Sequence, residues 1–125
     1  MSKSGRPMSP HVTIYAFPVT ALSSITIRVT GMALSIGAAG VGAVELAGGN
    51  GAALAMMESI GSTGPVVASL AKFSIAFPSI YHYLGAVRHL VWDNFPEMLT
   101  NVDVAKASYA LVGSSLVLST GLTLM

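Results

Sequence analysis

The sequence contains no cysteine and few charged residues. Without thiolates the chain cannot hold an iron–sulfur cluster, a cysteine-based zinc site or a disulfide framework, so any redox cofactor must be bound by His, Met or shape. Charged residues make up 9% of the 125 positions and hydrophobic residues 53%, whereas soluble domains carry about 25% charged residues. This composition predicts a protein built for lipid. The net charge of +1 gives no electrostatic footprint for nucleic acid, which we therefore do not expect as a partner.

Long apolar segments are the main feature of the chain. Each has the length of about 20 residues, or more, that crosses the hydrocarbon core of a bilayer. The predicted transmembrane helices are residues 17–46, 65–91 and 104–124.

The segments between these spans have the composition of connections. Residues 47–64 are rich in glycine and too short to cross the membrane, and residues 92–103 begin with a polar break that carries the interfacial aromatic Trp92. We therefore predict an all-α integral membrane protein with two parts. An N-terminal segment, 1–16, precedes a three-helix membrane anchor domain, 17–125.

The basic residues predict the orientation of the chain. Lys3 and Arg6 precede the first span, Arg88 and Lys106 flank the second connection, and the first connection has no basic residue. Under the positive-inside rule, the N-terminus and the second connection face the cytoplasmic or matrix side. Three spans bury little surface, and their ionisable groups need partners. We therefore expect helices from another chain to complete a heterodimeric bundle.

His82 lies near the middle of the second span. Lys72 and Asp93 stand on either side of it at about ten residues, which is ~15 Å along a helix. Neutral imidazole is a good iron ligand, so His82 is a candidate axial ligand for a heme in the bundle. The alternative is a hydrogen bond between helices. His89 follows two helical turns later, ~10.5 Å along the axis, so the two imidazoles cannot ligate one iron.

Two basic side chains end the second span. If His82 holds an edge-on heme, Arg88 and His89 fall where its propionates would emerge, and positive donors there would neutralise the carboxylates. Interfacial anchoring by snorkelling is the other interpretation of both residues. His11, the remaining histidine, cannot reach the midplane. A six-coordinate heme would therefore take its second ligand from a different chain.

The first span offers a second candidate site. Ser24 and Arg28 are one helical turn apart on one face, so a hydroxyl and a guanidinium could hold a quinone carbonyl and stabilise negative charge on it. Alternatively, Arg28 pairs with a carboxylate of a neighbouring helix or with a heme propionate. Lys72, near the other membrane surface, is expected to snorkel.

Three stretches of the sequence resemble one family. These are residues 6–15 (RPMSPHVTIY), residues 24–31 (SITIRVTG) and residues 82–93 (HYLGAVRHLVWD). In this order and on this pattern of spans, they resemble the large cytochrome b membrane anchor subunits of succinate dehydrogenase, respiratory complex II. The resemblance covers nearly the whole chain.

The resemblance implies a four-subunit enzyme. A flavoprotein oxidises succinate, an iron–sulfur subunit relays electrons, and two membrane anchors share heme b and bind ubiquinone or rhodoquinone. It implies that His82 is the heme b axial ligand, that Arg88 and His89 lie near the propionates, and that Ser24 and Arg28 are quinone-site positions. The small anchor subunit would supply the second heme ligand, and this chain would have no independent catalysis.

The family also implies a location, and two departures from its pattern stand out. Similarity to mitochondrial and alphaproteobacterial members favours the mitochondrial inner membrane, with the N-terminus on the matrix side, over a bacterial cytoplasmic membrane. The family commonly has His where this chain has Ile27, and Asn-Gly where it has Gly85 and Ala86. The anchor of a quinol:fumarate reductase and a non-redox structural membrane subunit remain alternatives.

Overall fold

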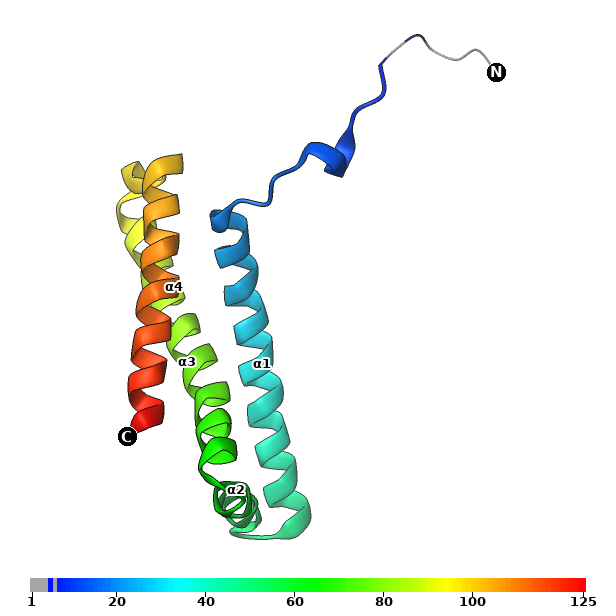
Figure 1. The fold of residues 1–125 in the computed structure, drawn as a ribbon, viewed down its shortest axis with the longest axis vertical. Coiled ribbons are helices and arrows are strands. Elements are labelled where there is room, and N and C mark those ends of the chain that lie inside the picture. The colour runs from blue at the N-terminus through cyan, green and yellow to red at the C-terminus, as the bar shows by residue number, and fades with distance from the viewer. Residues whose placement is uncertain (1–4, 6) are drawn as a thin grey trace.

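The computed structural model describes residue 5 and residues 7–125, which form helices and connecting turns (Figure 1). This confirms the predicted all-α fold. Lys3 and Arg6, which contributed to the predicted orientation, lie outside the described residues. The elements are η1 (His11–Ile14), α1 (Val19–Gly48), α2 (Ala52–Ser62), α3 (Pro65–Asn94), η2 (Pro96–Met98) and α4 (Asn101–Leu124).

The turn between α1 and α2 is held by one carboxylate. Gly49 and Gly51 adopt φ values of 85° and 89°, which glycine reaches without steric cost, so the chain reverses after α1. The Glu45 side chain then accepts hydrogen bonds from the backbone N–H of Gly51 at 2.6 Å and of Ala53 at 2.9 Å. These are unpaired donors at the start of α2, so Glu45 joins the end of α1 to α2.

The other two long helices begin at recognisable signals. Pro65 is the first residue of α3, where its missing N–H costs nothing. The Thr100 hydroxyl caps α4 by accepting from the Asp103 N–H at 3.1 Å. Because of this cap, α4 begins three residues earlier than the apolar pattern indicates, and α3 continues to Asn94 through the polar end of its span.

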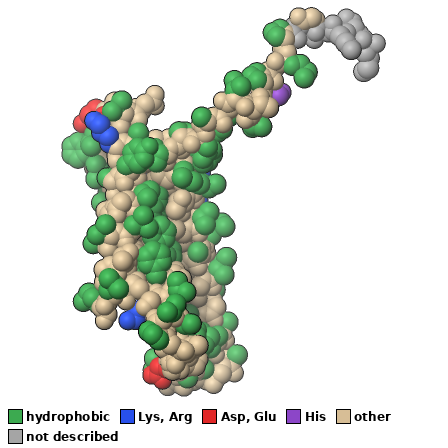
Figure 2. Space-filling view, viewed as in Figure 1, with side chains coloured by type: hydrophobic (Ala, Val, Ile, Leu, Met, Phe, Trp, Pro, Cys, Tyr) green, Lys and Arg blue, Asp and Glu red, His purple; other side chains and the backbone are tan. Residues whose placement is uncertain are grey.

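The three long helices run side by side in alternating directions, and α2 lies across the end where α1 and α3 meet (Figure 1). The interior is small and largely polar. Among the described residues, the largest fully buried side chains are Tyr81 and four serines, while many Leu, Ile, Val and Met side chains are exposed. Figure 2 shows apolar side chains along the whole length of the visible face, with charged ones toward the two ends. Such a surface suits lipid and partner helices.

Within residues 5 and 7–125, two helices have the length and composition to cross a membrane. These are α1 and α4. Helix α3 is long enough, but it is less apolar than α1 and α4. It carries four basic side chains: Lys72, His82, Arg88 and His89. The count of three transmembrane helices therefore stays a prediction, although α3 has the same length as α1 and packs against both other long helices.

Candidate functional site

A buried polar cluster ties the three long helices together at the end toward η2. Tyr81 on α3 is 1% exposed, and its hydroxyl lies 3.2 Å from the Ser23 Oγ on α1 and 3.3 Å from the Ser23 carbonyl oxygen. Two helical turns along α3, Arg88 Nη1 donates to Ser23 Oγ at 3.1 Å and to Ser108 Oγ on α4 at 3.1 Å. Arg88 therefore connects α1 to α4 through hydrogen bonds in the bundle interior.

The guanidinium of Arg88 also contacts an aromatic ring of its own helix. Its Cζ lies 4.5 Å from the centroid of the Trp92 ring, a cation–π contact. Its Nε is buried without a hydrogen-bond partner in the part of the chain that the structure describes. His89 packs edge-on against the same Trp92, with ring centroids 5.5 Å apart, and is exposed. The two neighbouring basic residues thus occupy different surroundings.

His82 contacts the backbone of α1. Its Nδ1 lies 3.0 Å from the Ile27 carbonyl oxygen. A carbonyl oxygen only accepts hydrogen bonds, so Nδ1 carries a proton, and in the neutral imidazole the lone pair is then on Nε2. The imidazole is half-buried. The arrangement therefore presents one nitrogen in the form that ligates a metal ion.

Two glycines allow α1 and α3 to approach closely around this contact. A Cβ built on Gly31 of α1 would lie 2.7 Å from His82 Cε1, and a Cβ built on Gly85 of α3 would lie 2.8 Å from Ile27 Cδ1. The His82 imidazole thus fills the space above Gly31, and the Ile27 side chain fills the space above Gly85. Each helix contributes one side chain and one glycine to the contact.

A hollow begins one helical turn away from His82, on the side toward α2. It has a volume of about 390 Å³ and lies between α1, α2 and α3. Its lining is almost wholly apolar and includes Leu34, Gly37, Ile75 and Pro78. Ile75, Pro78 and His82 follow one face of α3, so the imidazole lies near the edge of an apolar cavity.

The structure separates Ser24 and Arg28 from the buried cluster. Ser24 is half-buried and Arg28 is exposed, and neither side chain makes a hydrogen bond within the described residues. The serine that meets Tyr81 and Arg88 is Ser23. Sequence reasoning missed Ser23, Tyr81 and Ser108, although the spacing of Tyr81 and Arg88 already places them on one face of a helix.

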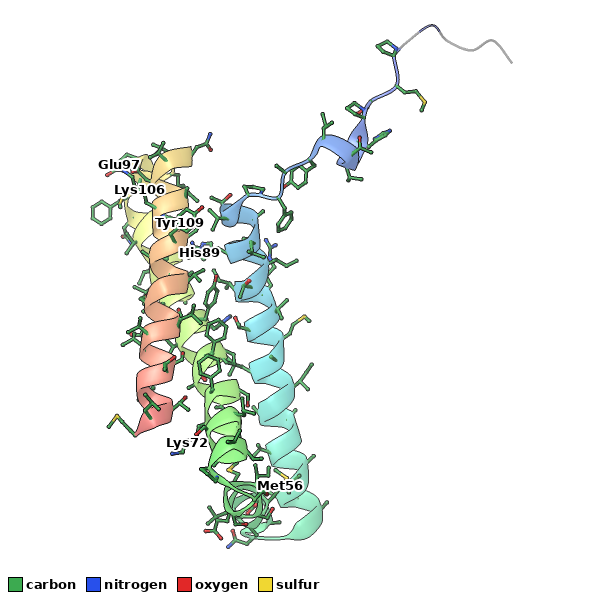
Figure 3. The ribbon with its side chains drawn as sticks, in the orientation of Figure 1. Met56, Lys72, His89, Glu97, Lys106 and Tyr109 are labelled. Atoms are coloured by element: carbon green, nitrogen blue, oxygen red, sulfur yellow. The ribbon has the colours of Figure 1, made fainter. Side chains whose placement is uncertain are left out.

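The remaining basic side chains mark the two ends of the bundle (Figure 3). His89 lies toward the end that carries Glu97 and Lys106, whereas Lys72 lies toward the opposite end, where α2 carries Met56. Residues 5 and 7–125 contain no group of three or more His, Asp or Glu side chains that could hold a bare metal ion. The candidate metal ligand is therefore the single imidazole of His82.

The described residues form an all-helical protein in which α1 and α4 have the length and composition of membrane spans. The family model for the succinate dehydrogenase/fumarate reductase transmembrane subunit matches residues 2–122. The chain belongs to this family.

Relatives of known name agree with this assignment. The chain is 35% identical over 115 residues to the mitochondrial succinate dehydrogenase cytochrome b560 subunit of Dictyostelium discoideum, an alignment covering 92% of this chain and 59% of the relative. It is 34% identical to the cytochrome b560 subunit of Bos taurus, over 96% of this chain and 71% of the relative. It is 33% identical to the cytochrome b556 subunit of Paracoccus denitrificans, over 95% of this chain and 90% of the relative.

The lengths compared differ among these relatives. The chain spans 59% of the Dictyostelium subunit and 54% of the Sus scrofa subunit. These matches confirm the predicted resemblance to succinate dehydrogenase cytochrome b subunits. That prediction was based on residues 6–15, 24–31 and 82–93.

Proposed function

We propose that this chain is the heme b and quinone-binding membrane anchor subunit of a succinate:quinone oxidoreductase. Its role is to pass electrons from an iron–sulfur subunit to quinone, and it has no independent catalysis. The observation that carries the proposal is the His82 imidazole, with Nδ1 fixed on the Ile27 carbonyl oxygen and Nε2 free to act as a ligand. The names of the relatives, all cytochrome b subunits, support it.

The residues around His82 fit a flat, largely apolar cofactor. Gly31 leaves room for the imidazole against α1, and the apolar hollow one turn away leaves room beside the ligand. Heme, when bound, supplies one-electron redox chemistry between the iron–sulfur subunit and quinone. Of the histidines in the described part of the chain, His82 is the one whose ring is held against a neighbouring helix, and it would ligate the iron. A second ligand would come from the small anchor subunit.

Arg88 and His89 of α3 would interact with the propionates of the heme. His89 is exposed, and it lies two turns from His82 on nearly the same face of α3, so it can donate to a propionate. Arg88 points into the bundle toward Ser23 and Ser108. Its charge acts on the propionates from the interior, while its hydrogen bonds hold α1 and α4 in place around the site.

Ser24 and Arg28 form the quinone site. Neither side chain makes a hydrogen bond to another described residue. Arg28 is exposed, so its guanidinium is available to a ligand or partner. The guanidinium orients a quinone carbonyl and stabilises the negative charge that reduction brings, while the Ser24 hydroxyl donates a second hydrogen bond. The alternative for Arg28 is an ion pair with a partner carboxylate or a heme propionate. The quinone is ubiquinone or rhodoquinone.

The location and partners follow from the same proposal. The chain lies in the mitochondrial inner membrane, with a bacterial cytoplasmic membrane as the alternative, because relatives of both kinds match it. The partners are a small anchor subunit, an iron–sulfur subunit and a flavoprotein. An enzyme run as a quinol:fumarate reductase would use the same anchor, since the direction of turnover depends on the quinone potential.

The heme assignment is tested by replacing the ligand in the whole complex. We expect His82→Ala to abolish or alter the low-spin b-type spectrum in reduced-minus-oxidised difference spectra, while dye-linked succinate oxidation by the flavoprotein persists. His11→Ala is the matched control, because His11 is exposed and precedes α1, and it should leave the spectrum intact. An unchanged b-type spectrum in the His82→Ala complex would refute the assignment, and a wild-type complex without b heme would favour a non-redox structural subunit.

A further inference from the structure

The contact between α1 and α3 is built from two reciprocal pairs. Ile27 and Gly31 are one turn apart on α1, and His82 and Gly85 are one turn apart on α3. The helices run in opposite directions, so Ile27 meets Gly85 while Gly31 meets His82. Both pairs are closer than a methyl group on the glycine would permit.

The first pair leaves the imidazole little freedom. A methyl group on Gly31 would lie 2.7 Å from His82 Cε1 and 3.2 Å from Nδ1, distances at which the ring must move. The same ring is held by the 3.0 Å contact between Nδ1 and the Ile27 carbonyl oxygen. Moving the ring away from Gly31 therefore stretches or breaks this hydrogen bond.

We infer that Gly31 is a positioning residue for the heme ligand: its missing side chain lets the His82 imidazole lie against α1, where the Ile27 carbonyl holds Nδ1–H and directs Nε2 at the iron. This inference rests on the proposed function of His82. It assigns to Gly31 a role beyond close helix packing, because the hydrogen bond that Gly31 permits acts on the ligand itself.

The hydrogen bond has an electronic consequence for a bound heme. A donor bond from Nδ1–H gives the imidazole more imidazolate character and makes Nε2 a stronger base. A more basic ligand stabilises ferric over ferrous iron and lowers the reduction potential, and hydrogen bonding to the ligand is one of the ways in which a protein sets that potential. Loss of the Ile27 contact should therefore raise the potential of the heme.

The test compares two glycines of the same helix in the purified four-subunit complex. Gly31→Ala should raise the midpoint potential of the heme and shift its low-spin electron paramagnetic resonance signal. Gly40→Ala is the matched control, since a Cβ at Gly40 meets nothing within 4 Å. The two changes favour the helix equally, so an effect through helix propensity would appear in both. Identical potentials and signals in the two variants would overturn the inference.

A second pair of variants reaches the same hydrogen bond from α3 and serves if Gly31→Ala does not assemble. Gly85→Ala pushes against the Ile27 side chain at 2.8 Å and should also raise the potential, by a smaller shift. Adding Ile27→Ala removes the atoms that the new methyl group meets, so the double variant should return to the wild-type potential. A shift that persists in the double variant, or no shift in Gly85→Ala, would contradict the proposed contact.

The outcomes also separate this inference from the proposed function. A b heme that depends on His82 but has the same potential in Gly31→Ala and Gly40→Ala refutes only the positioning role. A low-spin heme that is unchanged in His82→Ala, or the absence of heme from the wild-type complex, refutes both.

Discussion

Adjacent residues of α1 have different roles because one step along a helix turns a side chain by about 100°. Ser23 faces the bundle and accepts hydrogen bonds from Tyr81 and Arg88, while Ser24 is half-buried and keeps its hydroxyl free of these partners. The same substitution can therefore be compared at the two positions. At Ser23 it should lower the stability of the membrane domain, and at Ser24 it should raise the KM for quinone.

Ser23→Ala should destabilise the membrane domain by about 1–2 kcal/mol, because two buried donors lose one acceptor and a hydrogen bond between membrane helices contributes about 0.6 kcal/mol on average. Thermal unfolding of the detergent-solubilised complex measures this. Ser24→Ala should stay within about 0.5 kcal/mol of wild type and instead raise the KM for quinone. A larger stability loss from Ser24→Ala than from Ser23→Ala would show that the serine assignments are reversed.

Arg28→Lys should reduce succinate-to-quinone electron transfer about tenfold, which corresponds to about 1.4 kcal/mol. A lysine keeps the charge but loses the planar pair of donors that an arginine offers to an oxygen acceptor. The comparison is dye-linked succinate oxidation in the same preparation, which bypasses quinone and should be unchanged. Equal loss in both assays would indicate an assembly defect and would count against the quinone site.

At the scale of single elements, the turns fix how the long helices are joined. The α1–α2 connection combines two glycines at positive φ with the Glu45 carboxylate, which accepts from two backbone donors at the start of α2. Among the described residues no N-cap side chain helps to hold the start of α2, because the N-cap is Gly51, which has none. Glu45 therefore adds a side-chain link between the end of α1 and the start of α2, beside the packing of α2 on α1 and α3.

Replacing Glu45 by Ala should loosen the start of α2. The backbone amides of Gly51 and Ala53 lose their acceptor, and we expect both to exchange hydrogen faster in the folded complex, as measured by mass spectrometry of the peptides that contain them. Glu58→Ala is the matched control, because Glu58 lies within α2, is exposed and makes no hydrogen bond among the described residues. Equal exchange in the two variants would mean that α2 is held by its packing alone.

At the scale of the whole molecule, the distribution of side chains is the reverse of that in a soluble protein. Small and polar residues occupy the interior, and large apolar residues cover the outside. Helix α3 carries both the exposed cation Lys72 and the half-buried Arg88. Whether α3 crosses the bilayer decides on which side each connection lies.

Single cysteines can answer this directly, since the chain has none of its own. If α3 spans the membrane, a membrane-impermeant maleimide should label Ser62→Cys from one side of sealed vesicles and Glu97→Cys only from the other. Both residues are exposed and lie at opposite ends of the bundle. The positive-inside rule places Glu97 on the cytoplasmic or matrix side. Labelling of both positions from one side would show that α3 does not cross.

The sequence by itself determined the class of the protein, the approximate helices and the motif that contains His82, because hydropathy and helical period are local properties. It placed Ser24 and Arg28 on one helix face and Arg88 beside His89. It did not show which of these side chains point into the bundle and which point outward. The tertiary structure decided that Ser23 meets Tyr81 and Arg88, that Gly31 receives the imidazole, and that Nδ1 carries the proton. The relative rotation and register of packed helices depend on contacts between residues far apart in the chain, and a helical pattern read along one segment does not contain them.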